Sequence, residues 1–327
     1  MRFAESANPH RMVRAPAMAW LGMALLVCSG CASAPRRLSV PAVAPQAAYA
    51  TPQAAAEALV AAAQKGDRAA LGSVLGSGLA DLDSGDPVQD ARGLEKFAQH
   101  AGEGLQVSPR PEGGMQLEIG ANHWPFPIPM VQGADGRWRF DTVAGHARIL
   151  ARRIGADELA AVGVCTAYVD AQRAYASVDR DGGGVLKYAQ RFMSHPGTHD
   201  GLYWPAAAGE PQSPFGPFVA EATAEGYTPG QNKSPGPHPF HGYCFHILKR
   251  QGRTAPGGRY DYVINGNMIA GFALVAWPVR YGNSGVMTFI VSHQGKIYQK
   301  DLGADTEVRA RRMTEYEPDA SWHLVQP

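Results

Sequence analysis

The stretch DELAAVGVCTAYVDAQRAY, residues 157–175, decides how the second half of the chain folds. Ala161, Val164 and Tyr168 lie three and four residues apart, and the same spacing continues to the end of the stretch. This period is typical of a helix that buries one face. Residues 243–300 then form short runs of β-branched and aromatic residues, separated by Asn-Gly and Gln-Gly turns. The sequence therefore predicts a helix packed on an antiparallel meander, within a C-terminal domain of residues 151–327.

A glycine- and proline-rich region lies between that helix and the strands. Residues 180–242 show little periodicity and are predicted to be a long loop, which in a compact chain is often functional. Exposed aromatic residues on loops are typical of interfaces. A contact surface is therefore predicted at four aromatic residues of this region: Tyr203, Trp204, Phe215 and Phe218.

The first half of the chain changes from a helical to an alternating pattern. Thr51-Pro52 and Asp67 are good helix starts, and alternating apolar residues with interspersed prolines follow after residue 104. Residues 51–150 are thus predicted to be a small α+β domain of helices and a curved antiparallel sheet. An aromatic wall with one imidazole and one carboxylate would suit small-molecule binding or acid–base chemistry. The predicted pocket residues are His123, Trp124, Trp138 and Asp141, and the alternative is that the aromatic residues fill the core.

The N-terminus has the pattern of an export signal. Three arginines precede an apolar run at residues 18–27, which is too short for a bilayer that needs about 20 residues. Ser29-Gly30-Cys31 resembles a bacterial lipobox, in which the cysteine is lipidated. Residues 1–30 are therefore predicted to be a lipoprotein signal peptide and Cys31 the lipidated residue, with plain secretion as the alternative.

The segment after the signal predicts the location of the protein. Residues 31–50 are rich in alanine and proline and are predicted to be a flexible tether. Ala32 stands where enteric lipoproteins retained in the inner membrane carry aspartate. The expected location is the cell envelope, on the periplasmic face of the outer membrane, and the alternative is a soluble secreted or periplasmic protein.

Two cysteines remain once the signal and the lipidation site are set aside. Cys165 and Cys244 would lie in an oxidising compartment, where they could form a disulfide. Buried cysteines also occur as separate thiols. The sequence leaves both alternatives open.

Two groups of residues have some of the features of metal sites. Asp179 and Asp181 lie at alternate positions of a glycine-rich loop, as in calcium loops, but too few carboxylates follow them. His195 and His199 could be zinc ligands, but Pro196-Gly197 between them argues against a helix that would place them on one face. We expect a glycine-rich turn and ordinary hydrogen-bonded histidines, with no metal and no cofactor.

Composition and motifs exclude some classes of function. The net charge is +1 with 18% charged residues, and no basic stripe indicates a nucleic-acid partner. Ser194 and His195 are adjacent, which is poor geometry for a catalytic dyad, and no Gly-x-Ser-x-Gly motif is present. The sequence thus gives no catalytic residue and favours a binding protein over an enzyme.

Several runs of residues resemble a known bacterial family. They are WPFPIP at 124–129, WRFD at 138–141, DGLYWP at 200–205, GFALV at 271–275 and YQKDLG at 298–303. In this order they resemble the family known as domain of unknown function 2950, over residues 51–325. The resemblance implies an exported setting and no mechanism.

Each half of the chain also has a weaker fold likeness. The first half resembles a nuclear-transport-factor-2-like cone, and the second half resembles the globular head of a type IV pilin without its hydrophobic stalk. The predicted function is an exported, non-enzymatic envelope lipoprotein that binds another envelope protein. The alternatives are a small-molecule-binding protein or hydrolase that uses a pocket in the first domain, and a pilus or secretion accessory protein.

Overall fold

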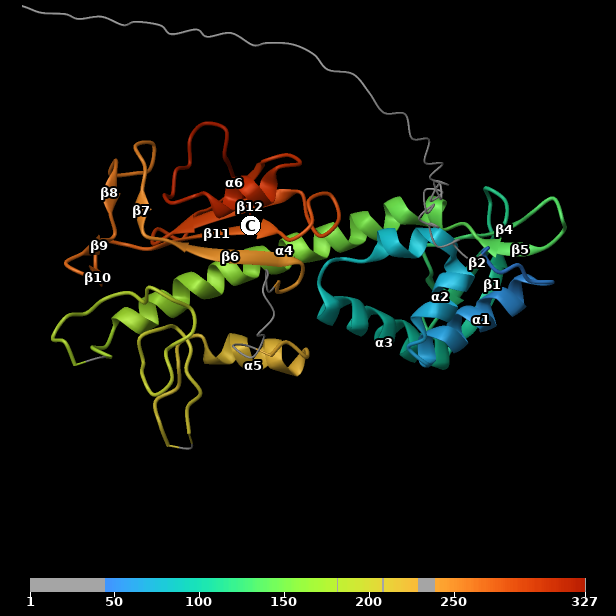
Figure 1. Ribbon diagram of the computed structural model, residues 1–327, viewed down its shortest axis with the longest axis horizontal. Helices are drawn as coiled ribbons and strands as arrows, with labels where there is room; N and C mark the ends of the chain where they lie inside the picture. Colours follow the sequence, from blue (N-terminus) through green and yellow to red (C-terminus); the bar gives the residue numbers. More distant parts are fainter. Residues whose placement is uncertain (1–44, 181, 208, 229–238, 327) are drawn as a thin grey trace, which may run out of the picture. The chain divides into compact units, whose positions relative to one another are not determined.

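The computed structural model describes residues 45–180, 182–207, 209–228 and 239–326 (Figure 1). The predicted signal peptide, Cys31 and most of the predicted tether lie outside these residues, as does Asp181. The predicted tether extends a few residues too far, because Gln46 Nε2 donates hydrogen bonds to Val74 O and Phe140 O. Within the described residues, no helix is long and apolar enough to cross a membrane.

The first half of the chain begins with helices, two of which start at Thr51 and Asp67, as the sequence predicts. The side chains of Thr51, Asp67 and Asp86 each accept hydrogen bonds from backbone N–H groups in the first turn of a helix. The helical segments in this part are α1 (Pro52–Gln64), α2 (Arg68–Leu75), the 3-10 helix η1 (Gly76–Leu82) and α3 (Pro87–Glu103).

An antiparallel sheet follows these helices. Its strands are β1 (Leu105–Pro109), β2 (Met115–Ile119), β3 (Trp124–Pro125), β4 (Met130–Gln132) and β5 (Trp138–Phe140). The order is β1-β2-β4-β5, and β3 pairs with β2. Gly114 has φ +77°, and a Cβ there would lie 2.5 Å from Met130 O, so only glycine allows β2 and β4 to meet at this point. The sheet and the helices share one hydrophobic core.

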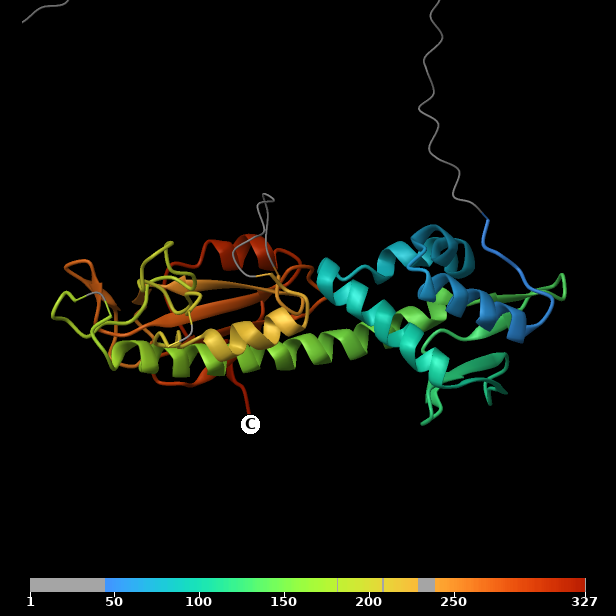
Figure 2. The ribbon, with the colours of Figure 1, turned by 90° about the horizontal axis from the view of Figure 1, so that it is seen from below.

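A single helix, α4 (Thr142–Ala176), serves both halves of the chain (Figures 1 and 2). The sequence predicts a start near Asp157, and this is wrong, because Asp141 Oδ1 caps the helix at Ala144 N, at 3.0 Å. Close to that start, a Cβ on Gly145 would lie 2.7 Å from Ile128 Cγ1, so the helix packs tightly on the first core. Its later turns bury Ala161 to Tyr175 in a second core.

The second core is built on a five-stranded antiparallel sheet between two layers of helix. The strand order is β14-β13-β12-β11-β6, and Figure 1 shows α4 and α6 on opposite faces. The elements are β6 (Tyr243–Leu248), β11 (Ala273–Pro278), β12 (Met287–Ser292), β13 (Ile297–Asp301), α6 (Thr306–Arg311) and β14 (His323–Leu324). Together the two halves confirm the predicted α+β class, with a helix on an antiparallel sheet in the second half.

The region predicted as a long loop contains more structure than expected. A short helix, α5 (Gly216–Ala224), lies within it, and residues 229–238 lie outside the described part. Two small two-stranded sheets also follow β6. They are β7 (Arg250–Gln251) with β8 (Tyr260–Asp261), and β9 (Val263–Ile264) with β10 (Asn267–Met268).

Candidate functional site

A large cavity lies in the first half of the molecule. Its volume is about 1260 Å³, and its lining comes from α1, α2, α3, the β2–β3 region and residues 149–157 of α4. Most of the wall is aliphatic or aromatic, including Leu59, Leu71, Leu75, Leu94, Phe97 and Phe126. Typical small-molecule sites have volumes of about 300–1,000 Å³ and mostly apolar walls. The cavity is therefore large enough for an extended apolar ligand.

The apolar side of α3 packs only partly against the first core, and the remainder of it borders the cavity. Leu94, Phe97, Ala98 and Ala101 recur at helical spacing, yet of these only Ala101 is buried. Leu94 and Phe97 stay half-buried and line the cavity. An amphipathic helix normally turns such a face to a packed core, and here the part of the face that is not packed contributes apolar surface to the cavity wall.

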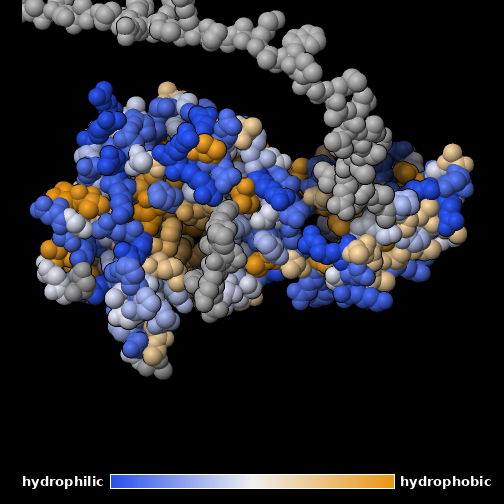
Figure 3. Space-filling model, in the orientation of Figure 1, coloured by the Kyte–Doolittle hydropathy of each residue, from blue (hydrophilic) through white to orange (hydrophobic). Residues whose placement is uncertain are grey.

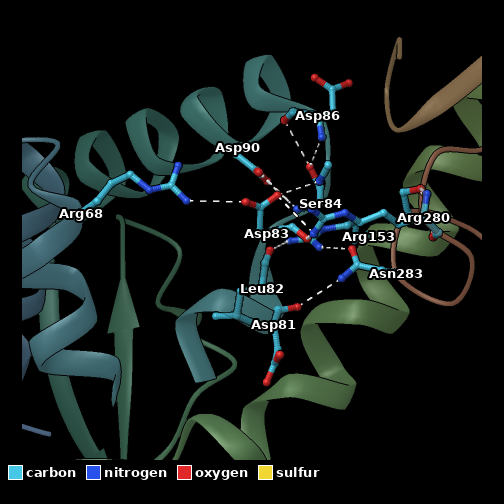
Figure 4. A network of polar contacts seen from close by, with 12 residues as sticks. Arg68, Asp81, Leu82, Asp83, Ser84, Asp86, Asp90, Arg153, Arg280 and Asn283 are labelled. Carbon is cyan, nitrogen blue, oxygen red and sulfur yellow. Dashed lines mark hydrogen bonds and ion pairs between the residues drawn. The ribbon is translucent and has the colours of Figure 1, made fainter. Parts of the chain in front are cut away.

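One end of the cavity is polar. The lining here includes Asp83 from the segment between η1 and α3, Gln89 and Asp90 from the start of α3, and Arg153 and Asp157 from α4. Figure 4 shows the segment between η1 and α3 at the centre of this network, with Arg68 on one side and Arg280 and Asn283 on the other.

Arg153 joins three segments of the chain at this end. Its guanidinium donates to Leu82 O and to Asn283 Oδ1, the latter at 2.6 Å. Burial lowers the pKa of Arg153, and the negative charges of Asp90 and Asp157 oppose that effect. Arg280 reinforces the junction, because its guanidinium donates to Asp83 O at 3.1 Å.

Asp157 is the most buried charged residue of the cavity lining, at 1% exposure. Gln89 Nε2 donates to Asp157 Oδ1, while Asp157 Oδ2 and Gln89 Oε1 are buried without a hydrogen-bond partner. Burial raises the pKa of Asp157 to about 7; the hydrogen bond from Gln89 and the positive charge of Arg153 act in the opposite direction. This carboxyl therefore takes up a proton far more readily than an ordinary aspartate.

A second carboxylate lies close by and is fully paired. Asp86 Oδ2 accepts from the Tyr227 hydroxyl at 2.9 Å and from Gly242 N at 3.1 Å. Gly242 has φ +69°, and a Cβ there would lie 2.7 Å from Asp157 Oδ2. Glycine thus allows the chain before β6 to approach both carboxyl groups.

The residues predicted as a pocket do not come together. Trp124 lines the cavity, and the Arg152 guanidinium lies 4.9 Å from the centre of its ring. His123 lies on a turn, 3.8 Å from Glu118 Oε2, and Trp138 pairs in β5 with β4. Asp141 is the cap of α4. Of the four residues predicted to form a pocket, Trp124 alone lines the cavity, and the other three have different structural roles.

The aromatic residues predicted as a contact surface are packed inside the second half instead. Trp204 and Phe215 are only 3% and 7% exposed, and Tyr203 and Phe218 pack against the same core. Trp204 Nε1 donates to Pro211 O at 3.1 Å. The prediction is wrong because a long segment that covers a helix needs large apolar side chains to attach it.

The two remaining cysteines are free and buried, so the structure does not contain the disulfide considered from the sequence. Cys165 lies on α4 and interacts electrostatically with Tyr243 of β6. Cys244 follows Tyr243 in β6, and its thiol interacts instead with the charges of Arg311 and Glu307 on α6. Consecutive strand residues point to opposite faces of a sheet, which separates the two thiols. Burial raises the pKa of both to about 12.

The candidate metal ligands make local contacts. Asp179 Oδ2 accepts from Gly184 N at 2.8 Å, and His195 Nδ1 lies 2.7 Å from Asp200 Oδ2. The His199 ring stacks on Trp204, with 4.3 Å between the ring centres. Throughout the described part of the chain, no three His, Cys, Asp or Glu residues are grouped so that they could hold a metal ion.

Sequence reasoning missed the polar end of the cavity. In the sequence, Asp157 marked only the expected start of a helix, and Arg153 was not among the candidate site residues. Their spacing of four residues on one helix was the available signal. For Gln89 and Asp86 the sequence holds no comparable signal of their contacts, because their hydrogen-bond partners are distant in the sequence.

The chain belongs to the family described as protein of unknown function (DUF2950), whose model matches residues 46–325. No curated protein and no solved structure shows a significant match to it. The match to the family covers both halves of the chain and assigns no activity to them.

Proposed function

We propose that this protein is an extracytoplasmic binding protein that holds an apolar or amphipathic small molecule in the cavity of its first half. The observation that carries the proposal is a cavity of about 1260 Å³ whose wall is mainly aliphatic and aromatic. A cavity of this size without an occupant would leave Leu94 and Phe97 facing water, which is unfavourable by roughly 25 cal/mol for each Å² of apolar surface.

The charges around the cavity argue for a ligand without net charge. Acidic and basic residues both occur in the lining, and several of them neutralise one another. Arg68, for example, lies 3.8 Å from Asp83 Oδ2. A site for an anion or a cation would present an excess of the opposite sign, so the expected ligand is uncharged or zwitterionic.

The export signal predicted from the sequence supports this proposal. We propose that Cys31 carries a lipid and anchors the protein to the periplasmic face of the outer membrane, where apolar molecules need a carrier to cross an aqueous space. Replacing Cys31 by serine should release the protein from membranes in a fractionation experiment. Retention of the variant in the membrane fraction would contradict lipidation at this residue.

The test of ligand binding uses a variant that fills the cavity. Gly93 lines the cavity on α3, and nothing lies within 4 Å of a Cβ built on it. Gly93→Leu should therefore abolish binding of N-phenyl-1-naphthylamine, measured by fluorescence, and keep the protein folded. Gly102→Leu is the matched control, because Gly102 lies on the same helix, is equally unobstructed and is outside the lining.

Competition with dodecyl compounds then defines the ligand class. Dodecanol and dodecylphosphocholine should displace the probe, and dodecanoate and dodecyltrimethylammonium should displace it weakly. Absence of probe binding to the wild-type protein, after extraction of any bound lipid, would overturn the proposed function. Equal binding by Gly93→Leu would show that the probe binds elsewhere.

A second candidate function rests on a different surface. Figure 3 shows apolar residues over β9 and β10 and over the loop after α4. The exposed aliphatic residues there are Val185, Leu186, Ile264 and Ile269. The two segments are neighbours, because Tyr188 N donates to Met268 O at 2.8 Å. This surface favours the envelope-scaffold alternative, in which Leu186→Ser with Ile264→Ser should abolish cross-linking to the partner.

A further inference from the structure

Two oxygen atoms without partners belong to side chains that already touch. Gln89 Nε2 donates to Asp157 Oδ1, and the other oxygen of each side chain, Asp157 Oδ2 and Gln89 Oε1, is buried without a hydrogen bond. If Asp157 is ionised, both of these oxygens are acceptors and neither can satisfy the other. A buried acceptor without a donor typically costs about 1–3 kcal/mol.

A single proton on Asp157 would give both oxygen atoms a hydrogen bond. A neutral carboxyl group can donate O–H from Oδ2 to the amide oxygen of Gln89, while the amide N–H donates to Oδ1. We propose that Asp157 is protonated in the folded protein and forms with Gln89 a two-bond acid–amide clasp, which holds α3 against α4 and closes the polar end of the cavity until a rise in pH removes the proton. The role of the clasp in ligand retention rests on the proposed function; the clasp itself does not.

The groups around Asp157 favour the neutral form. Among the described residues, Asp157 has no ion-pair partner within 4.0 Å, and Arg153 directs its hydrogen bonds to Leu82 O and Asn283. Asp86 and Asp90 approach from the start of α3, and their negative charges oppose ionisation of Asp157.

The remaining neighbours do not supply a cation that would bind the carboxylate. From α4 itself, Glu158 is the next residue and accepts from Val286 N and Met287 N. From β6, Tyr243 donates its hydroxyl to Met287 O. Arg280, on the turn after β11, is paired with Asp83 at 3.5 Å. Burial accordingly raises the pKa of Asp157 to about 7.

The clasp acts on the cavity because Gln89 lies in the first turn of α3. The same helix carries Leu94 and Phe97 into the wall one and two turns later. The segment before Gln89 has its own ties, since Asp86 accepts from Tyr227 and Asp90 accepts from Ser84 N. Loss of the clasp should therefore loosen α3 against α4 without detaching the segment that precedes it.

The test separates the clasp from ligand binding. Carbon NMR of the aspartate carboxyl groups, without ligand, should show Asp157 titrating near neutral pH, well above the usual value of about 4. Hydrogen exchange in α3, corrected for intrinsic rates, should be about tenfold faster at about pH 8.5 than at about pH 5.5. Asp157→Asn should abolish this difference, because its amide N–H replaces the carboxyl O–H and cannot be lost.

Two further variants complete the design. Gln89→Ala should raise exchange in α3 at both pH values, because it removes both hydrogen bonds of the clasp. Asp170→Asn is the matched control, since Asp170 is an exposed carboxylate on the same helix, 3.8 Å from Arg173. It should leave the pH difference unchanged.

The outcomes distinguish the two proposals. An Asp157 carboxyl that titrates with the other aspartates, or an Asp157→Asn variant whose α3 exchanges as fast as that of Gln89→Ala, would overturn the clasp and leave ligand binding untouched. If the probe dissociates several-fold faster at the higher pH from the wild type, but not from Asp157→Asn, both the clasp and ligand binding in the cavity are supported. No probe binding at either pH would overturn the proposed function, and the NMR titration would still decide the clasp.

Discussion

The two hydrophobic cores of this chain share one helix and differ in how they are filled. In the second half, Phe272 is fully buried, with its ring centre 5.6 Å from that of Tyr168 and 4.8 Å from that of Tyr188. In the first half, Leu94 and Phe97 line a cavity of about 1260 Å³. The second core is closed by contacts between aromatic rings, whereas the first core borders the cavity in which we propose that a ligand binds.

The largest expected effect is the loss of an aromatic side chain from the filled core. Phe272→Ala should lower the free energy of unfolding by about 3–5 kcal/mol, because the surrounding rings cannot close over the space it leaves. Chemical denaturation of the ligand-free protein measures this change.

Leu94→Ala is the corresponding truncation of an apolar side chain in the first core, next to the cavity. It should cost less than about 2 kcal/mol, since that side chain is only partly buried and therefore loses less apolar contact than Phe272 does. Similar costs for the two variants would contradict the contrast between the cores, and would mean that the cavity is filled by side chains in solution.

The next effect is a dependence of stability on pH. The pKa of Asp157 is raised in the folded protein to about 7, above its ordinary value near 4. Between these values the folded state binds a proton that the unfolded state lacks, so the contribution of Asp157 to stability falls as pH rises from about 4 to about 7, and then stays constant. The total fall is at most about 4 kcal/mol, at about 1.4 kcal/mol for each pKa unit.

Denaturation of the wild type and of Asp157→Asn across this pH range checks the prediction. The variant should lack this part of the slope and should be the more stable of the two above pH 7. A variant that is less stable than the wild type at all pH values would show that the ionised carboxylate is the form that the fold requires.

Substitutions at two glycines of α4 allow its packed side, at Gly145, to be compared with a side that has open space, at Gly155. A Cβ on Gly145 would lie 2.7 Å from Ile128 Cγ1, so Gly145→Ala should destabilise the protein by about 1–3 kcal/mol. Gly155 has nothing within 4 Å of an added Cβ, so Gly155→Ala should stabilise the protein by up to about 1 kcal/mol. Thermal denaturation measures both changes, and the same sign for both would contradict the close contact at Gly145.

Local signals in the sequence predicted elements well and contacts poorly. Thr51 and Asp67 marked helix starts, and the spacing from Ala161 to Tyr175 marked the buried face of α4. Each of these depends on neighbours within one or two turns. The cavity instead depends on the incomplete packing of the apolar side of α3, and its polar end joins Gln89 to Asp157, which are 68 residues apart. No periodicity records such a pairing.

The smallest expected effect on stability comes from Asp141, and it tests whether this residue caps α4 or lines a binding pocket. Asp141 Oδ1 accepts from Ala144 N at 3.0 Å, so Asp141→Ala should lower stability by about 1 kcal/mol and leave binding of N-phenyl-1-naphthylamine unchanged. Asp305 has the same position at the start of α6 but makes no side-chain cap hydrogen bond, so Asp305→Ala should change stability by less than about 0.5 kcal/mol. Asp141 does not line the cavity. If Asp141→Ala remains folded but no longer binds the probe, the probe must bind near Trp138, in the packed part of the first core, and not in the cavity.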